Sequence, residues 1–443
     1  MRPEKVIAVF DVGKTNKKLL LFNEKYQLVS EKSVRLPETV DEDGFACEDV
    51  HELTEWLINS FEELSLNDKV QLAAINFSGY GASFVHVASN GQPVTPLYNY
   101  LKPYPEKLQH QLYDKYGGEQ LFSLTTASPV LGSLNSGLQL YRIQQEQPGV
   151  FDKIRCSLHL PQYLSFVLSG SMNTDITSIG CHTQLWDFTK NEYHAWLRDE
   201  GLLSKFAPLK SGDMLTGAEG GRLPIGVGLH DSSAALIPYL LQFKEPFILI
   251  STGTWCISMN PFNDESLTEE ELKQDCLCYL TYTGMPVKAS RLFAGNEHET
   301  GVTRIAAHFN TTAQAVTNVS YNEDIIASLQ SSSPDADGDF KRRSLETFTG
   351  IEEAYHQLMI DIMHQQVAAA NLVFGKKGVE TIFVDGGFSK NYIYMKLLAK
   401  AYPSVRVSAA SVPHSTAMGA ALAIHKYWNN LAMPENLVKI KQY

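Results

Sequence analysis

The sequence predicts an α/β protein built from two related domains. Strand-like apolar runs alternate with helix-like segments over most of the 443 residues, as in layered α/β folds. A short pattern also occurs twice. Near the start, the apolar residues 6–10 lead into a polar, glycine-containing turn at 11–16 and a second apolar run at 19–22. Halfway along the chain, residues 247–250 lead into the turn 251–254 in the same way, so we expect a β-hairpin to open each half.

Between the two hairpins, the sequence predicts a strand and two helices. Residues 71–77 are largely apolar and end at a Ser-Gly-Tyr-Gly stretch, which is typical of a strand followed by a turn. Residues 134–143 and 161–168 have the pattern of helices. Pro161 suits a first helical turn, and Gly170 follows the expected end of the second helix.

The second half predicts a long helix, then a strand and another helix. Apolar side chains at helical spacing line one face of residues 351–373, and a basic, glycine-bearing stretch at 375–378 ends this helix. Residues 381–384 form the expected strand. A glycine pair follows the strand, and the next helix is expected from about Ser389.

Composition and charge exclude several classes of protein. The hydrophobic fraction of 44% and the charged fraction of 19% are ordinary for a globular chain, which excludes whole-chain disorder, collagen and coiled coil. The net charge of −12 opposes binding to phosphate backbones and anionic membranes, so we expect no nucleic-acid partner and no membrane partner. No apolar run reaches about 18 residues, and no secretory signal is visible.

The six cysteines predict reduced thiols. They are scattered and form no CxxC pair, and Cys276 and Cys278 are too close together for a common zinc site. Scattered cysteines in a long chain are typical of a reducing compartment. Because no secretory signal is visible either, we expect a cytoplasmic protein.

The two hairpin turns have the composition of phosphate-binding turns. Residues 13–16 combine a glycine with small, hydroxyl and basic side chains, so that backbone N–H groups and a lysine can face a phosphate. The turn is not a P-loop, because Ala8 stands where a second glycine is needed and a strand follows. Gly253 and Thr254 give the second turn the same chemistry. Each turn alone is equally typical of a plain hairpin, and Trp255 of a buried core aromatic.

Two other segments are candidates for binding and catalysis. Gly386 and Gly387 allow a flat ring or a phosphate to approach the backbone closely, although such a pair is also a common connection. Asp231 follows a glycine-rich stretch and precedes an apolar helix. The residue is either a helix N-cap or a general base that accepts a hydroxyl proton. The neighbouring His230 alone is more typical of a packing histidine.

Taken together, these motifs resemble the FGGY carbohydrate kinases of the actin-like ATPase fold. The resemblance spans nearly the whole chain, and the order and spacing of the motifs make it specific. The matching segments are residues 11–16 (first phosphate motif), 251–255 (second phosphate motif), 386–391 (adenosine motif), 414–422 (the alanine-rich helix near the C-terminus), and 164–170, 174–175 and 183–187 of the N-terminal domain.

The resemblance implies an α/β, actin-like ATPase (ribonuclease H-like) fold with two related domains around a central cleft. Residues 1–242 would form the sugar-binding domain and residues 243–443 the nucleotide-binding domain. The activity implied is transfer of the γ-phosphoryl group of ATP to a small-molecule sugar, with Mg²⁺. A homodimer is left open.

The resemblance also implies roles for individual residues. Asp231 would be the catalytic base, and Asp11 would hold Mg²⁺ through water. The phosphates would be held by Gly13, Lys14, Thr15, Asn16, Gly253 and Thr254. The adenosine would be held by Gly386, Gly387 and Asn391. The sugar would contact Tyr80, Gly81, His230, Asp231 and Asn296.

The pair His230-Asp231 and the triplet 253–255 resemble L-rhamnulose and L-fuculose kinases, which suggests a 6-deoxy-ketohexose. The sequence also departs from the family. Lys18 stands where arginine is common, and residues 96–102 lack an acid that often contacts the sugar. A pentulose kinase of the xylulose or ribulose type therefore remains an alternative. A catalytically silent sugar or nucleotide sensor and an actin-like filament protein are further alternatives.

Overall fold

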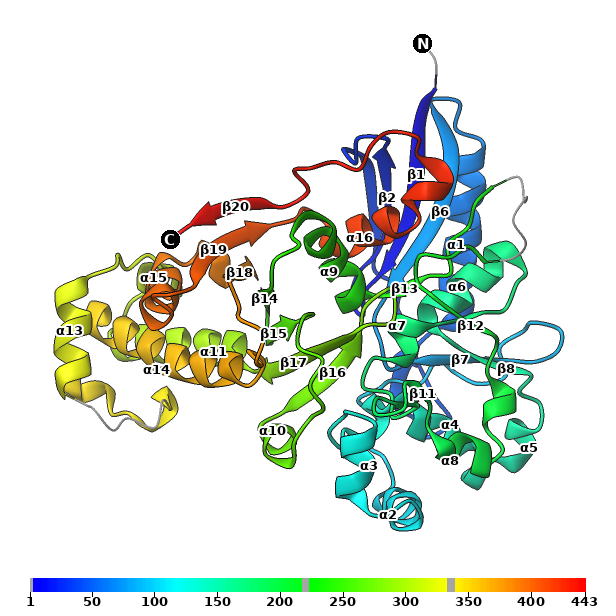
Figure 1. Ribbon diagram of the computed structural model, residues 1–443, viewed down its shortest axis with the longest axis horizontal. Coiled ribbons are helices and arrows are strands. Elements are labelled where there is room, and N and C mark those ends of the chain that lie inside the picture. Colours follow the sequence, from blue (N-terminus) through cyan, green and yellow to red (C-terminus); the bar gives the residue numbers. More distant parts are fainter. Residues whose placement is uncertain (1–2, 217–222, 333–338) are drawn as a thin grey trace.

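The computed structural model describes residues 3–216, 223–332 and 339–443, and it contains two large sheets (Figure 1). The first sheet has five strands in the order β13-β6-β1-β2-β3. These strands are β1 (Glu4–Val12), β2 (Lys17–Asn23), β3 (Leu28–Val34), β6 (Val70–Gly79) and β13 (Leu229–His230).

The second sheet has seven strands in the order β16-β17-β15-β14-β18-β19-β20. These are β14 (Phe247–Thr252), β15 (Cys256–Asn260), β16 (Cys276–Leu280), β17 (Pro286–Leu292), β18 (Thr381–Gly386), β19 (Arg406–Ser411) and β20 (Lys439–Gln442).

The two sheets repeat one topology. In the first, β1 pairs antiparallel with β2, β2 pairs antiparallel with β3, and β6 and β13 add parallel strands on the other side of β1. In the second, β14, β15 and β17 form the antiparallel part, and β18 and β19 are the parallel additions. The hairpins β1–β2 and β14–β15 thus occupy equivalent places, which confirms the prediction of an α/β protein with two related domains.

The helices are divided between the two halves of the chain. In the first half they are α1 (Val50–Ser65), α2 (Glu106–Lys115), α3 (Glu119–Thr125), α4 (Ser136–Glu146), α5 (Pro148–Phe151), α6 (Leu160–Ser169), α7 (Ile176–Ile179), α8 (Ala195–Asp199) and α9 (Asp231–Gln242). In the second half they are α10 (Glu269–Lys273), α11 (Ala294–His308), α12 (Ala313–Thr317), α13 (Glu323–Ser332), α14 (Ile351–Asn371), α15 (Tyr392–Ala401), α16 (Ser415–Ala423) and α17 (His425–Trp428).

Short elements complete the structure. The small strands are β4 (Glu38–Val40), β5 (Ala46–Glu48), β7 (Phe84–Val87), β8 (Cys156–His159), β9 (Thr174–Asp175), β10 (Trp186–Asp187), β11 (Glu192–Tyr193) and β12 (Leu209–Lys210). The 3₁₀ turns are η1 (Gly132–Leu134), η2 (Leu203–Lys205), η3 (Phe340–Arg342), η4 (Leu345–Thr347) and η5 (Phe388–Lys390).

The predicted helices are present, with shifts at two starts. Helix α6 ends as expected, because Gly170 takes the left-handed conformation at φ 71°. Helix α4 begins at Ser136 because the preceding residues form the turn η1. Helix α15 begins at Tyr392 rather than near Ser389, since η5 comes first and Asn391 caps the helix.

Helix α16 joins the two halves. It follows β19 of the second sheet in sequence, but it packs against α9 and against β1 and β6 of the first sheet (Figure 1). Gly419 makes the close approach possible, because a Cβ atom there would lie 1.8 Å from the carbonyl oxygen of Ala234 in α9. Asn76 in β6 donates a hydrogen bond to the carbonyl of Ala420 at 2.7 Å.

Two further expectations can be compared with the structure. All six cysteines are free and buried, as predicted for reduced thiols. Within the described residues, every helix is too short or too polar to cross a lipid bilayer.

The contact at Gly419 predicts a stability effect. Gly419→Ala should lower the free energy of unfolding by about 1–3 kcal/mol, because the added methyl group must push α9 and α16 apart. The control is Gly149→Ala in α5, where nothing lies within 4 Å of the added Cβ, and its stability should be equal or slightly higher. Chemical denaturation compares the two, and equal midpoints would contradict the close packing.

Candidate functional site

Three parallel strands bring the predicted catalytic residues to one edge of the first sheet. In the strand register, Asp11 of β1 lies opposite Ser78 of β6, and His230 of β13 lies opposite Gly79. Since parallel strands end at the same edge, Asp11 and the segments that begin at Tyr80 and Asp231 lie together there.

Asp231 is the first residue of α9, and the N-cap residue is His230, whose side chain makes no capping hydrogen bond. Its carboxylate accepts a hydrogen bond from the N–H of Ser232 at 2.6 Å, and about a third of the side chain is exposed (34%). The surrounding protein atoms desolvate the carboxylate and raise its pKa to about 6, although the bonds from Ser232 oppose this shift. The carboxylate is therefore a stronger base than an ordinary aspartate and still mostly ionised at neutral pH.

His230 is a buried, neutral partner of Asp231. Burial lowers the pKa of its imidazole to about 3. Its Nε2 atom lies 3.2 Å from Oδ1 of Asp231 and 3.0 Å from Sγ of Cys181, a contact that the sequence did not indicate. Gly81 lies against the same ring, since a Cβ atom there would come within 2.9 Å of it. A side chain at position 81 would therefore displace the imidazole.

Asp11 is the second carboxylate of this edge. Burial raises its pKa to about 6, and the charge of Asp231 adds to the shift. Thr416 at the start of α16 donates a hydrogen bond to Oδ2 of Asp11 at 2.8 Å. Although residues 414–422 were noted as a motif, a contact across 405 positions in sequence carries no local signal.

A cation is the natural neighbour for two such carboxylates. The described residues contain no group of three or more His, Cys, Asp or Glu side chains that could by itself hold a metal. Mg²⁺ is commonly held by one or two carboxylates together with water and substrate phosphates. Asp11 fits this use, because a bound cation would offset the cost of burying its negative charge and the repulsion from Asp231.

The first hairpin turn leaves its backbone donors free. The N–H of Gly13 closes the turn on the carbonyl of Asn16 at 3.0 Å. Among the described residues, nothing accepts from the N–H groups of Lys14, Thr15 and Asn16. Lys14 pairs with Glu38 at 3.1 Å, so its ammonium group is already partly neutralised. The turn thus offers several backbone donors to an anion.

The second turn lies beside the glycine pair. Thr252 at the end of β14 is opposite Gly386 at the end of β18. Gly386 needs its glycine, because φ is 91° and a Cβ atom would lie 1.9 Å from the carbonyl oxygen of Thr252. Gly387, by contrast, has open space where a Cβ would be, and Gly253 and Thr254 are exposed. The two predicted nucleotide-binding segments therefore meet at one edge of the second sheet.

Hydrogen bonds within the second half of the chain show where Asn296 and Asn391 lie. The N–H of Asn296 donates to the carbonyl of Thr254 at 3.3 Å, so Asn296 lies beside the second turn. Asn391 has two partners within the protein: its Oδ1 accepts from Tyr394 and its Nδ2 donates to the hydroxyl of Tyr355. An open pocket of about 630 Å³ has Asn391 in its lining.

Trp255 departs from the expectation of a buried aromatic. Its side chain is 44% exposed, and its ring lies 4.5 Å from that of Phe293, centroid to centroid. The Arg291 guanidinium lies 5.5 Å from the same ring. In the described parts of the chain, no hydrogen bond or ion pair joins the second turn to the first.

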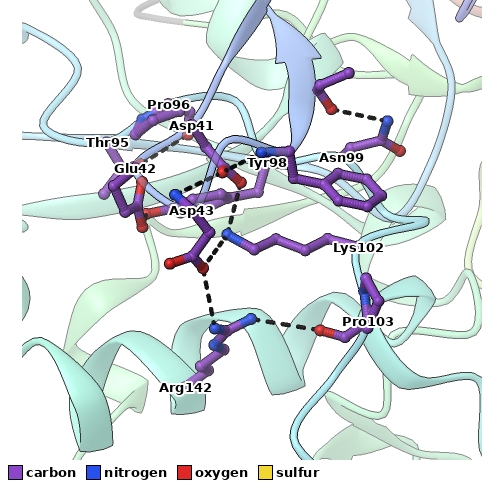
Figure 2. Close-up of polar contacts among 12 residues, drawn as sticks. Asp41, Glu42, Asp43, Thr95, Pro96, Tyr98, Asn99, Lys102, Pro103 and Arg142 are labelled. Carbon is purple, nitrogen blue, oxygen red and sulfur yellow. Dashed lines mark hydrogen bonds and ion pairs between the residues drawn. The ribbon is translucent and has the colours of Figure 1, made fainter.

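Residues 96–102, the segment that lacks the expected acid, are anchored to the β4–β5 hairpin (Figure 2). Lys102 is 8% exposed and pairs with Asp41 at 2.6 Å and Asp43 at 2.7 Å. Tyr100 lies in the same segment, and its ring is 5.9 Å from that of Tyr80, centroid to centroid. Burial raises the pKa of Tyr100, and the nearby charge of Asp231 contributes in the same direction. A neutral phenol thus lies near the sugar-binding candidates.

Comparison with known proteins relates both halves of the chain to one family. Residues 6–205 match the N-terminal domain of the FGGY family of carbohydrate kinases, and residues 244–432 match the C-terminal domain of carbohydrate kinase FGGY. A rhamnulokinase from Mannheimia succiniciproducens is 25% identical over 270 residues, which are 58% of this chain and 55% of that protein. The chain thus spans about half the length of the curated relatives it matches.

Solved structures resemble nearly the whole chain. A carbohydrate kinase from Novosphingobium aromaticivorans is 21% identical, with a TM-score of 0.81 over 99% of this chain and 94% of that one. A ligand-bound xylulose kinase from Lactobacillus acidophilus is 17% identical, with a TM-score of 0.80 over 99% and 93%. At these identities the likeness shows the fold alone, and it confirms the expected actin-like architecture.

The proximity of the two carboxylates predicts a coupled titration. Asp231→Asn should lower the pKa of Asp11 from about 6 toward its ordinary value near 3.8, because one source of repulsion is removed. The shift should be partial, since burial of Asp11 remains. Carboxyl ¹³C NMR of aspartate-labelled protein measures it, with Asp385→Asn in β18 as the control. An unchanged titration of Asp11 would show that the carboxylates are not neighbours.

Proposed function

Because this chain belongs to the FGGY family of carbohydrate kinases, we propose that it transfers the γ-phosphoryl group of ATP to a hydroxyl group of a ketose. The observation that carries the proposal is the partly exposed carboxylate of Asp231, whose pKa is raised to about 6 beside a second carboxylate at Asp11. A general base for neutral pH needs such an intermediate pKa.

Asp231 acts as the base in this proposal. A sugar hydroxyl is a weak nucleophile, and its proton must leave as its oxygen bonds to the γ-phosphorus and the bond to the β-phosphate oxygen breaks. Asp231 takes that proton. His230 is buried and neutral. Its Nε2 atom lies 3.2 Å from Oδ1 of Asp231, and the ring adds no competing charge. Positioning and electrostatic stabilisation supply most of the catalysis in such phosphoryl transfers.

The other residues hold the nucleotide. Asp11 would hold Mg²⁺ together with water, and the ion would supply positive charge to neutralise the phosphates. The N–H groups of residues 14–16, in the turn that Gly13 closes, and the turn of Gly253 and Thr254 bind the phosphates. The adenosine lies against Gly386 and Gly387. Asn391 contributes to this pocket mainly by fixing its wall, since both ends of its side chain are bonded within the protein.

We propose a 6-deoxy-ketohexose, such as L-rhamnulose or L-fuculose, as the substrate. The rhamnulokinase relative supports this choice, and the neutral side chains of Tyr80, Tyr100 and His230 suit a sugar with one hydroxyl fewer. Gly81 packs against His230, so the absence of a side chain there lets the imidazole keep its place in the sugar site. Asn296, beside the second turn, is a further candidate for contact with the sugar. A pentulose remains the alternative, because xylulose kinases share the fold.

The proposal includes the roles of the two halves. Residues 1–242 bind the sugar and residues 243–443 bind the nucleotide, and closure of the halves excludes water from the reacting groups. The buried, free cysteines support a cytoplasmic location. The partner is a small sugar; a homodimer is compatible with this proposal and not needed by it.

Removal of the base tests the chemistry. Asp231→Asn should lower kcat by about 10²–10⁴-fold while leaving nucleotide binding in place. For the wild type, kcat/KM should fall as the pH drops below about 6, since protonation removes the base, and should level off above it. A coupled ADP-release assay measures both. Asp264→Asn at a surface ion pair is the control, and full turnover by Asp231→Asn would reject the assignment.

A panel of ketoses tests the substrate. The wild type should release ADP fastest with L-rhamnulose or L-fuculose, and more slowly with xylulose, ribulose and the corresponding 6-hydroxy ketohexoses. One methyl group in an apolar pocket is worth about 1–3 kcal/mol, so the expected preference is about 10- to 200-fold. Preference for a pentulose would favour the alternative, and no turnover with any ketose would favour a sensor.

A further inference from the structure

A buried lysine lies beneath the first hairpin turn. Lys17 is the first residue of β2, and only 3% of its side chain is exposed. Its ammonium group donates hydrogen bonds to the backbone carbonyl of Gly13 at 3.2 Å and to that of Lys14 at 3.0 Å. Two successive carbonyl groups of the turn are therefore directed at one buried cation.

This arrangement fixes the direction of the backbone donors. In a trans peptide unit the C=O and the following N–H point in opposite directions. With the carbonyls of Gly13 and Lys14 held by Lys17, the N–H groups of Lys14 and Thr15 point away from it. Both N–H groups are without partners in the described residues. The turn thus presents donors, and no carbonyl of these two units, on the face where an anion would bind.

Glu48 holds the lysine in place. It is the last residue of β5, its side chain is 7% exposed, and its Oε2 lies 2.9 Å from the ammonium group of Lys17. Its other oxygen lies 3.5 Å from that of Lys14. A buried charge without its partner is strongly unfavourable, so the lysine and the glutamate keep each other in position. Lys102, which pairs with Asp41, anchors the hairpin that carries Glu48 (Figure 2).

The charge of the same carboxylate also acts on Tyr80, one of the sugar-binding candidates. Tyr80 is 8% exposed; burial raises the pKa of its phenol, and the charge of Glu48 raises it further. The N–H of Tyr80 donates to the carbonyl of Val12, next to the turn, at 3.2 Å. Glu48 therefore pairs with both Lys17 and Lys14, and the ammonium group of Lys14 lies 6.0 Å from the centroid of the Tyr80 ring.

We propose that Lys17 is a positioning residue that orients the first turn toward the terminal phosphates of ATP, and that Glu48 couples this turn to the sugar-binding segment at Tyr80. The inference rests on the proposed function for the identity of the anion. Lys17 acts through the backbone of residues 13–15 and does not itself touch the nucleotide.

Binding of two nucleotides to purified full-length protein tests the inference. Lys17→Met should weaken the affinity for Mg²⁺ with a non-hydrolysable ATP analogue by about 10- to 100-fold, the range expected for lost charged hydrogen bonds. The affinity for AMP, which lacks the terminal phosphates, should be unchanged. Lys17→Arg should recover part of the loss, because a guanidinium can also donate to two carbonyls. Calorimetric titration measures each affinity.

A double variant separates positioning from folding. Lys17→Met alone leaves the carboxylate of Glu48 buried without its partner, and this variant can lose stability. The combination with Glu48→Gln removes both charges, so it should recover the melting temperature without recovering affinity for the ATP analogue. Lys5→Met is the matched control, because it breaks an ion pair at the far end of the β1–β2 hairpin, and it should bind as the wild type does.

The outcomes are distinct. A folded double variant with wild-type affinity for the ATP analogue would overturn the role of Lys17, even if turnover of the wild type supports the proposed function. Equal losses for AMP and the analogue would also overturn it, since they would show a general structural effect. Binding of neither nucleotide by the wild type would reject the proposed function and, with it, this inference.

The KM values for the ketose and for ATP test the coupling through Glu48. In Glu48→Gln the KM for the ketose and the KM for ATP should both rise by several-fold, about 3- to 30-fold, as for the loss of one charged partner. In Lys17→Arg the KM for the ketose should stay near that of the wild type, since Glu48 keeps its charge. A rise in the KM for ATP alone in Glu48→Gln would remove the coupling from the proposal.

Discussion

The parallel pairing of β1, β6 and β13 is the constraint on which the rest of this protein depends. It brings Asp11, Tyr80 and Asp231 to one edge of a sheet, although the chain reaches this edge from three distant segments. Parallel strands of one sheet end on the same side, so their following loops share a site by geometry. The second sheet repeats the arrangement with β14 and β18 and thereby places two glycine-bearing turns side by side.

Burial sets the electrostatics of the site. Desolvation raises the pKa of Asp11 and of Asp231 to about 6 and keeps His230 neutral. Two carboxylates at one edge favour a cation beside them, and the charge of Asp231 makes Asp11 a better base. Beneath the first turn, by contrast, Lys17 and Glu48 are buried as a pair, so charge is used there to orient backbone groups rather than to react.

Helix α16 connects the chemistry of the two halves. It belongs to the second half in sequence, but Thr416 binds Asp11 and Gly419 lets the helix approach α9, which begins at Asp231. The pair of helices α9 and α16 therefore carries a contact to each carboxylate.

The sequence by itself determined the local elements and the chemical types of the site. Continuous apolar runs and glycine turns defined the hairpins β1–β2 and β14–β15, and helical spacing defined α6 and α14, because these signals arise from neighbouring residues. Composition also marked Asp231 and the glycine pair as candidates. Only the tertiary structure decided that Thr416 binds Asp11, that Cys181 touches His230, that Trp255 is exposed, and that Asn296 lies with the second turn. These facts depend on strand order and on packing between distant segments, for which the sequence carries no local pattern.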